Sequence, residues 1–270
     1  MRQSRALPLT TLLLFGYAFL YGPILVLIAY SFNDSKLVAV WGGFSTRWYG
    51  ALLDNERILG AAALSLQIAA ASATVAMLLG TAAAFALVRF GRFRGRTLFS
   101  GLLLAPLVMP DIIIGLSLLL LFVWLESLIG WPAGRGGLTI AAAHITVATA
   151  YTAVVVRARL VQFDRELEDA AADLGAPPLR AFLTVTLPLM APALAAGWLL
   201  AFTLSLDDLV IASFVSGPGS TTLPIAIFSS VRLGVSPQIN ALATIVVIAV
   251  AGTAAIAGWL LQRQRRGEGD

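Results

Sequence analysis

The chain contains no cysteine and only one histidine among its 270 residues. Without thiols, and with a single imidazole, it cannot build a zinc, iron–sulfur or haem-thiolate site, and it has no cysteine nucleophile. Redox chemistry on protein thiols is excluded for the same reason. The sequence therefore predicts no metal site and no cofactor bound by this chain.

Charge is also scarce. Charged residues make up 12% of the chain, whereas a soluble domain carries about 25%. Hydrophobic residues make up 59%, and the mean hydropathy is +0.89. A chain of this composition cannot cover a globule of its own size with polar surface, so we expect an integral membrane protein.

Long apolar runs account for most of the sequence. Crossing the hydrocarbon core takes roughly 20 apolar residues in a helix, and six runs meet this length. We therefore predict an all-α integral membrane protein with six transmembrane helices, forming a single transmembrane domain over residues 1–270. The predicted spans are Leu9–Tyr30, Leu59–Val88, Leu98–Leu125, Leu138–Val156, Ala191–Val215 and Ile239–Leu261.

The basic residues indicate how the chain is oriented. Six spans place both termini on one side, and that side collects thirteen of the Arg and Lys residues while the other side holds five. Basic residues concentrate in cytoplasmic loops, so both termini are predicted to be cytoplasmic. The net charge of +4 then reflects membrane topology, and no nucleic-acid partner is expected.

The cytoplasmic segment 157–190 is the most informative part of the chain. Its first part, up to Arg180, holds four Arg and five acids in a sequence that otherwise avoids charge. A short amphipathic helix is predicted over about Asp164–Leu174, with Gly175 as its stop and two prolines after it. A helix lying on lipid headgroups is the alternative, although the net charge of −1 disfavours contact with an anionic membrane surface. The apolar residues that share one helical face are Phe163, Leu167, Ala170, Ala171 and Leu174.

This segment resembles the EAA loop of ABC importer permeases, in which Glu-Ala-Ala is followed at fixed intervals by Gly and then by Ile-x-Leu-Pro. Here Asp169 stands where Glu is usual, with Glu168 beside it, and Val185 replaces Ile. The resemblance implies the architecture of a type I ABC importer permease, with a coupling helix that docks on a cytosolic ATPase. The residues it implicates in this coupling are Glu168, Asp169, Ala170, Ala171, Gly175, Leu187 and Pro188.

The lysine content agrees with an ATPase on a separate chain. A Walker A loop needs a lysine after its glycine-rich turn, and the single lysine, Lys36, lies in a predicted outer loop. This chain is therefore not expected to be an enzyme. Energy must come from a separate subunit, which would use ATP and Mg, or from an ion gradient.

Acids within apolar spans are costly and mark candidate functional sites. Asp111 follows Pro106 and Pro110, which should break the third span. Asp207 and Asp208 fall in the fifth span, where neighbouring residues point about 100° apart, so one can face a pathway while the other meets a neighbouring helix. A pathway lined by these three acids favours a cationic substrate. Helix capping, hydrogen bonds to Ser or Thr at a gate, or an Arg from a partner are the structural alternatives.

Four further segments resemble polyamine importer permeases, most of all those for putrescine and next those for spermidine and putrescine. The resemblance implies a bacterial inner-membrane subunit that pairs with a second, different permease, two copies of a cytosolic ATPase and a periplasmic polyamine-binding protein. It also implies alternating access driven by that ATPase. The segments are Ser205–Asp208, Ser213–Pro218, Leu223–Pro224 and Gly234–Thr244.

Three alternatives remain beside this interpretation. An ABC importer for another small cation or amine would share the same architecture. A proton-coupled secondary transporter could use Asp111 and Asp207 as relays, although such proteins normally show two related halves, which are not evident here. An intramembrane enzyme could combine His144, Ser205 and Asp207, but no Gly-x-Ser-x-Gly turn supports it.

Overall fold

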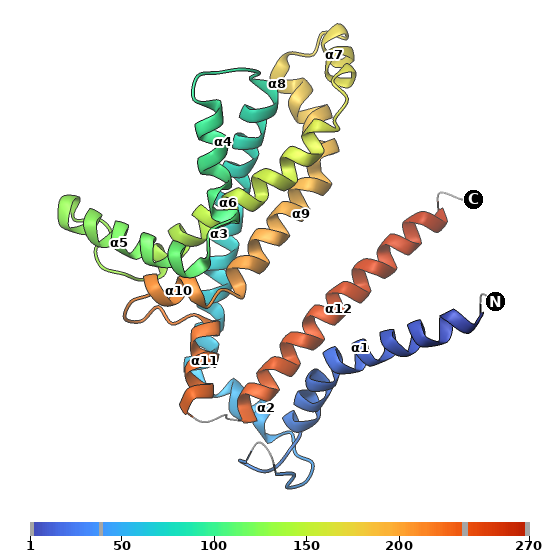
Figure 1. The fold of residues 1–270 in the computed structure, drawn as a ribbon, viewed down its shortest axis with the longest axis vertical. Helices are drawn as coiled ribbons and strands as arrows, with labels where there is room; N and C mark the ends of the chain where they lie inside the picture. The colour runs from blue at the N-terminus through green and yellow to red at the C-terminus, as the bar shows by residue number, and fades with distance from the viewer. Residues whose placement is uncertain (1–2, 38–39, 234–236, 268–270) are drawn as a thin grey trace. The chain divides into compact units, whose positions relative to one another are not determined.

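The computed structural model describes residues 3–37, 40–233 and 237–267, with side chains over 10–37, 40–232 and 237–252 (Figure 1). Segment 234–236, part of the fourth polyamine-permease segment, lies outside the described residues, as does Arg2. So do the side chains of Arg5, Arg263, Arg265 and Arg266, which contribute to the predicted orientation. The orientation and the single-domain assignment stay predictions.

The chain forms two compact units, each described here by itself. The first comprises residues 1–59 and 227–270. It contains α1 (Gln3–Ser31), α2 (Arg47–Leu53) and α12 (Pro237–Gly267), and α12 contacts both other helices. In the loop after α1, the indole Nε1 of the buried Trp48 donates to the carbonyl of Asn33 at 2.6 Å, which ties α2 to the end of α1.

The second unit comprises residues 60–226 and holds every candidate site residue. Its centre is α6 (Gly137–Val161), which contacts α9 (Leu187–Leu206), α10 (Val210–Val215) and α5 (Asp111–Ile129). The remaining elements are α3 (Glu56–Arg89, which begins in the first unit), α4 (Arg96–Leu104), the 3₁₀ helix η1 (Ala105–Leu107), α7 (Glu166–Asp173), α8 (Pro178–Ala181), the π-helix η2 (Phe182–Thr186) and α11 (Leu223–Leu233, which ends in the first unit).

The all-α membrane fold is confirmed. Within the described residues the structure contains no β-strand, and five helices are long and apolar enough to cross a membrane. Shorter apolar helices cover 96–107, 223–232 and 237–252. The sixth predicted span falls on α12, whose side chains are described as far as Gly252.

Two predicted spans are not single helices. The third, Leu98–Leu125, is divided into α4, η1 and α5, because Pro106 and Pro110 lack the N–H that an α-helix needs and clash with the preceding turn. This break before Asp111 was expected from the two prolines. The fifth, Ala191–Val215, is also wrong as one helix, since α9 ends at Leu206 and α10 begins at Val210.

Close backbone approach holds α3 against α6. A Cβ added to Gly80 would lie 2.0 Å from Thr152 Oγ1 and 2.8 Å from the backbone nitrogen of Ala153. The Thr152 hydroxyl hydrogen-bonds the carbonyl of Ala76 on α3 at 2.9 Å. Small residues that permit such contacts are typical of helix packing in membranes.

We expect Gly80→Val to destabilise the second unit by about 1–3 kcal/mol, because the side chain collides with the Thr152 side chain and with the backbone nitrogen of Ala153. The measurement is the thermal unfolding of the purified chain in detergent. Gly60→Val on the same helix is the matched control, since nothing lies within 4 Å of a Cβ at Gly60. Equal unfolding temperatures for the two variants would refute this packing account.

Candidate functional site

The break between α9 and α10 is built around Asp208. Its carboxylate accepts the backbone N–H of Ile211 at 3.2 Å and that of Ala212 at 2.7 Å, in the first turn of α10. The first N–H groups of a helix have no partner within the helix, so this side chain satisfies donors that would otherwise be orphaned. Asp208, one residue before the N-cap Leu209, therefore caps the first turn of α10 with its side chain.

The same carboxylate is held by His144 on α6. His144 Nε2 lies 3.0 Å from Asp208 Oδ2, and Nδ1 lies 2.6 Å from Ser205 Oγ on α9. An ionised carboxylate only accepts hydrogen bonds, so with Asp208 ionised the donor in this pair is His144 Nε2. The His144 side chain is 4% exposed. One buried imidazole thus links α6, α9 and the cap of α10.

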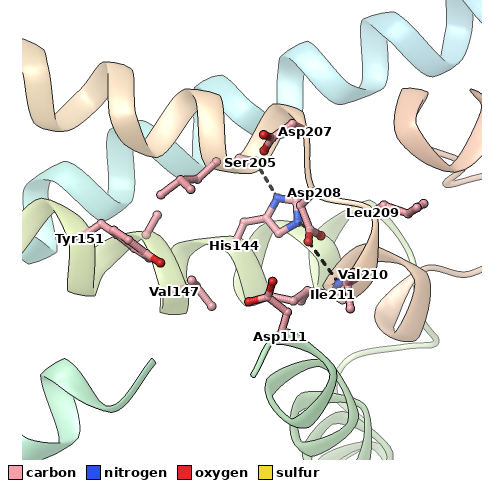
Figure 2. Close-up of a pocket in the computed structure, with 12 residues that line it drawn as sticks. Asp111, His144, Val147, Tyr151, Ser205, Asp207, Asp208, Leu209, Val210 and Ile211 are labelled. Carbon is pink, nitrogen blue, oxygen red and sulfur yellow. Dashed lines mark hydrogen bonds and ion pairs between the residues drawn. The ribbon is translucent and has the colours of Figure 1, made fainter. Parts of the chain in front are cut away.

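Asp111 and Asp207 are left free of these bonds. Both are exposed, and no hydrogen bond or ion pair reaches either carboxylate from another residue in the described part of the chain. Figure 2 shows them on either side of the His144 ring, Asp111 from the start of α5 and Asp207 from the end of α9.

A pocket of about 340 Å³ brings the three predicted acids together. Apolar residues of α6, including Val147, and the ring of Tyr151 form much of its wall beside them (Figure 2). The pocket can therefore offer two unpaired carboxylates and one aromatic ring to a cation. The lining residues are Asp111, His144, Val147, Ala148, Tyr151, Leu204, Ser205, Asp207, Asp208, Leu209, Val210 and Ile211.

The role of His144 was not predicted from the sequence. The structural alternatives given for the acids were helix capping, hydrogen bonds to Ser or Thr, and an Arg from a partner. Capping holds for Asp208, but its pairing with the imidazole of His144 was not predicted. Its expectation that one of Asp207 and Asp208 meets a neighbouring helix is confirmed, because Asp208 contacts α6. In the catalytic alternative, His144 was combined with Asp207, but the structure bonds it to Asp208.

The predicted cytoplasmic helix is α7, which covers Glu166–Asp173, and Gly175 follows its C-cap Leu174 as the expected stop. Gly175 has φ +82°, its N–H donates to the carbonyl of Ala172 at 2.8 Å, and the N–H of Ala176 donates to that of Ala171 at 3.0 Å. These two bonds form a Schellman motif, which needs a left-handed residue at this position.

The residues assigned to coupling lie on both sides of this turn. Asp169 and Ala170 are exposed on α7, Ala171 is partly exposed, and Glu168 points back to bond other parts of the chain. Leu187 and Pro188 begin α9 directly after the π-helix η2. The proline lacks an N–H, and a wide helical turn before it accommodates the missing bond.

The predicted apolar face of this helix is only partly correct. Phe163 precedes α7 and is buried in a core cluster with Val156 and Leu160 of α6. Leu167 and Leu174 are instead exposed, at 47% and 90%. The periodicity placed the residues on one face, but the chain turns between Phe163 and α7, so the exposed apolar surface is shorter than predicted.

Comparison with known proteins places these features in a family. The family model described as "Binding-protein-dependent transport system inner membrane component" matches residues 76–267. The chain is 61% identical over 255 residues to the putrescine transport system permease protein PotI of Escherichia coli (strain K12), covering 94% of this chain and 91% of the relative. It is 46% identical over 232 residues to the spermidine/putrescine transport system permease protein PotC of the same strain, covering 86% and 85%.

Solved structures agree on the fold. A bacterial ABC transporter involved in the import of the acidic polysaccharide alginate matches with a TM-score of 0.70 at 17% identity, covering 97% of this chain and 98% of that one. An amino acid ABC transporter with histidines matches with a TM-score of 0.56 at 17% identity, covering 80% and 98%. The chain, a multi-pass inner-membrane protein, therefore belongs to the family of inner-membrane components of binding-protein-dependent transport systems.

Proposed function

We propose that this chain is the permease subunit of a putrescine ABC importer. The observation that carries the proposal is the 61% identity to a putrescine permease over 94% of the chain. The pocket agrees with this substrate class, because the carboxylates of Asp111 and Asp207 are the free anionic groups of its wall. An alkyl diammonium can offer one ammonium group to each acid while its methylene groups lie against Tyr151.

The proposed mechanism is alternating access. A periplasmic binding protein delivers the polyamine to the outward-open pathway, and a pair of cytosolic ATPase subunits, which bind ATP and Mg, drives the change between states. A second, different permease subunit completes the pathway in this proposal, and both termini are cytoplasmic. Lys36 is the only lysine and does not follow a glycine-rich turn, which supports the proposal that ATP is hydrolysed on separate subunits.

The end of the second unit around α7 is the proposed ATPase contact. Leu174 and Leu179 expose 90% and 70% of their surfaces there, and Asp169 on α7 is also exposed. Exposed apolar side chains next to a charged rim fit a protein partner. Movement of the ATPase would act on α7 and pass to α9 through the continuous turn, α8 and η2.

The test is uptake of radiolabelled putrescine and spermidine by a bacterial strain that lacks this chain alone and has no other polyamine importer. We expect putrescine uptake to be lost and to return on re-expression, with a smaller effect for spermidine. Re-expression of a chain truncated before α7 is the control for non-specific rescue. Unchanged uptake of both amines would refute the proposed substrate and favour another small cation or amine.

A further inference from the structure

The side chain of Glu168 does not face outward with the rest of α7. Its Oε1 lies 2.9 Å from Arg89 Nη2, at the last residue of α3, and it also accepts a hydrogen bond from the buried hydroxyl of Thr186, at the end of η2. One carboxylate thus joins three elements that are separated in the sequence. We call Arg89, Glu168 and Thr186 the α7 joint.

The surroundings favour both charges of the joint. Arg89 ends α3 and Glu168 lies in the first turn of α7, the two helix termini at which a cation and an anion respectively are stabilised. The guanidinium also lies 5.6 Å from the ring centroid of the buried Phe163. The side chains of Arg89 and Glu168 are 15% and 27% exposed, so water screens the pair much less than a surface ion pair.

The α7 joint connects α7 to the membrane helices, so a movement of α7 would reach those helices through it. Along the backbone, α7 is connected to α9 by the turn at Gly175, the four-residue helix α8 and the π-helix η2. These are short elements with few internal hydrogen bonds. The ion pair supplies a second route, directly to the 34-residue helix α3. The bond to Thr186 connects the same carboxylate to the start of α9.

We propose that Arg89, Glu168 and Thr186 act as positioning residues that transmit movement between the ATPase contact on α7 and the membrane helices α3 and α9. This inference rests on the proposed function and assigns to Glu168 an internal role within the coupling that the resemblance implies. Loss of the joint leaves the outer surface of α7 intact, so the ATPase still binds but no longer responds to the binding protein.

The experiment uses the complete transporter in proteoliposomes. It measures the factor by which the loaded binding protein stimulates ATP hydrolysis, together with retention of the ATPase after purification. We expect Arg89→Gln and Glu168→Gln each to lower the stimulation factor about fivefold, because a charge-assisted hydrogen bond is lost and one charge stays unpaired. Both variants should retain the ATPase. Thr186→Val should show a smaller loss.

The matched control is Glu166→Gln, the same substitution in the same turn of α7. Its side chain is exposed, and its printed bond is made by its backbone N–H to Asp164. The double variant Arg89→Gln/Glu168→Gln should lose no more stimulation than either single variant, since both remove one interaction. If a single variant yields too little complex, the neutral double variant carries the same test.

Three results would overturn the proposal: a Glu168→Gln variant that matches Glu166→Gln, additive losses in the double variant, or release of the ATPase by Glu168→Gln but not by Arg89→Gln. The last result would mean direct contact between Glu168 and the ATPase. Failure of the unmodified complex to transport putrescine would refute the proposed substrate instead, because the stimulation factor does not depend on counting transported putrescine.

Discussion

Gly175→Val is expected to lower transport strongly while the chain remains inserted in the membrane. The backbone of Gly175 has φ +82°, and a β-branched residue is a genuine outlier in that region. Holding valine in this left-handed conformation costs about 1–2 kcal/mol. Since 1.4 kcal/mol is a tenfold change in an equilibrium constant, the population of the native turn after α7 should fall about tenfold. We therefore expect uptake to fall about tenfold or more, measured per inserted chain.

The matched control is Gly175→Asn. Nothing lies within 4 Å of a Cβ built on Gly175, so both side chains fit in space and differ mainly in tolerance of the left-handed conformation. Asparagine adopts that conformation readily, and its uptake should stay within about twofold of the unmodified chain. Equal uptake by the valine and asparagine variants would show that the Schellman turn after α7 does not matter for transport.

Asp208→Ala is expected to cause the largest loss at the pocket. It leaves the N–H groups of Ile211 and Ala212 and the Nε2 proton of His144 without an acceptor. A buried donor left unpaired costs about 1–3 kcal/mol, so both the thermal stability of the complex and uptake should fall sharply. The measurement is thermal unfolding in detergent together with putrescine uptake in proteoliposomes.

Asp207→Ala provides the contrast. Its carboxylate accepts no bond from another described residue, so stability should stay unchanged while uptake falls through loss of a cation partner in the pocket. His144→Ala should lower stability by less than Asp208→Ala, because the N–H groups of Ile211 and Ala212 keep their acceptor. The double variant should lose much less than the sum. If Asp207→Ala destabilises the complex as much as Asp208→Ala, the division of roles between the two acids is wrong.

The membrane helices and several of their ends could be predicted from the sequence. Apolar run length predicts membrane helices directly, because the bilayer requires a minimum length and satisfied backbone bonds. Pro106 and Pro110 predicted the break before Asp111, and Gly175 predicted where α7 ends. These features depend on local covalent geometry, so a single sequence reveals them.

The break between α9 and α10 could not be predicted from local sequence. The residues from Leu204 to Phe214 contain neither proline nor glycine, and their hydropathy continues that of a helix. The helix ends at Leu206 because Asp208 satisfies the first turn of α10 and pairs with His144, 64 positions away in the sequence. The helix propensity of neighbouring residues does not depend on a partner so far away in the sequence, so it could not predict this break.

The sequence by itself determined that the chain is a helical membrane protein without cysteine thiols, because composition and the length of apolar runs decide these properties. Only the tertiary structure decided which acids are bonded and which are free. Asp208 and Glu168 are held by His144 and Arg89, whereas Asp111 and Asp207 remain open to the pocket. The physical reason is that a carboxylate's role depends on the donors within about 3 Å of it, and packing brings those donors from other helices.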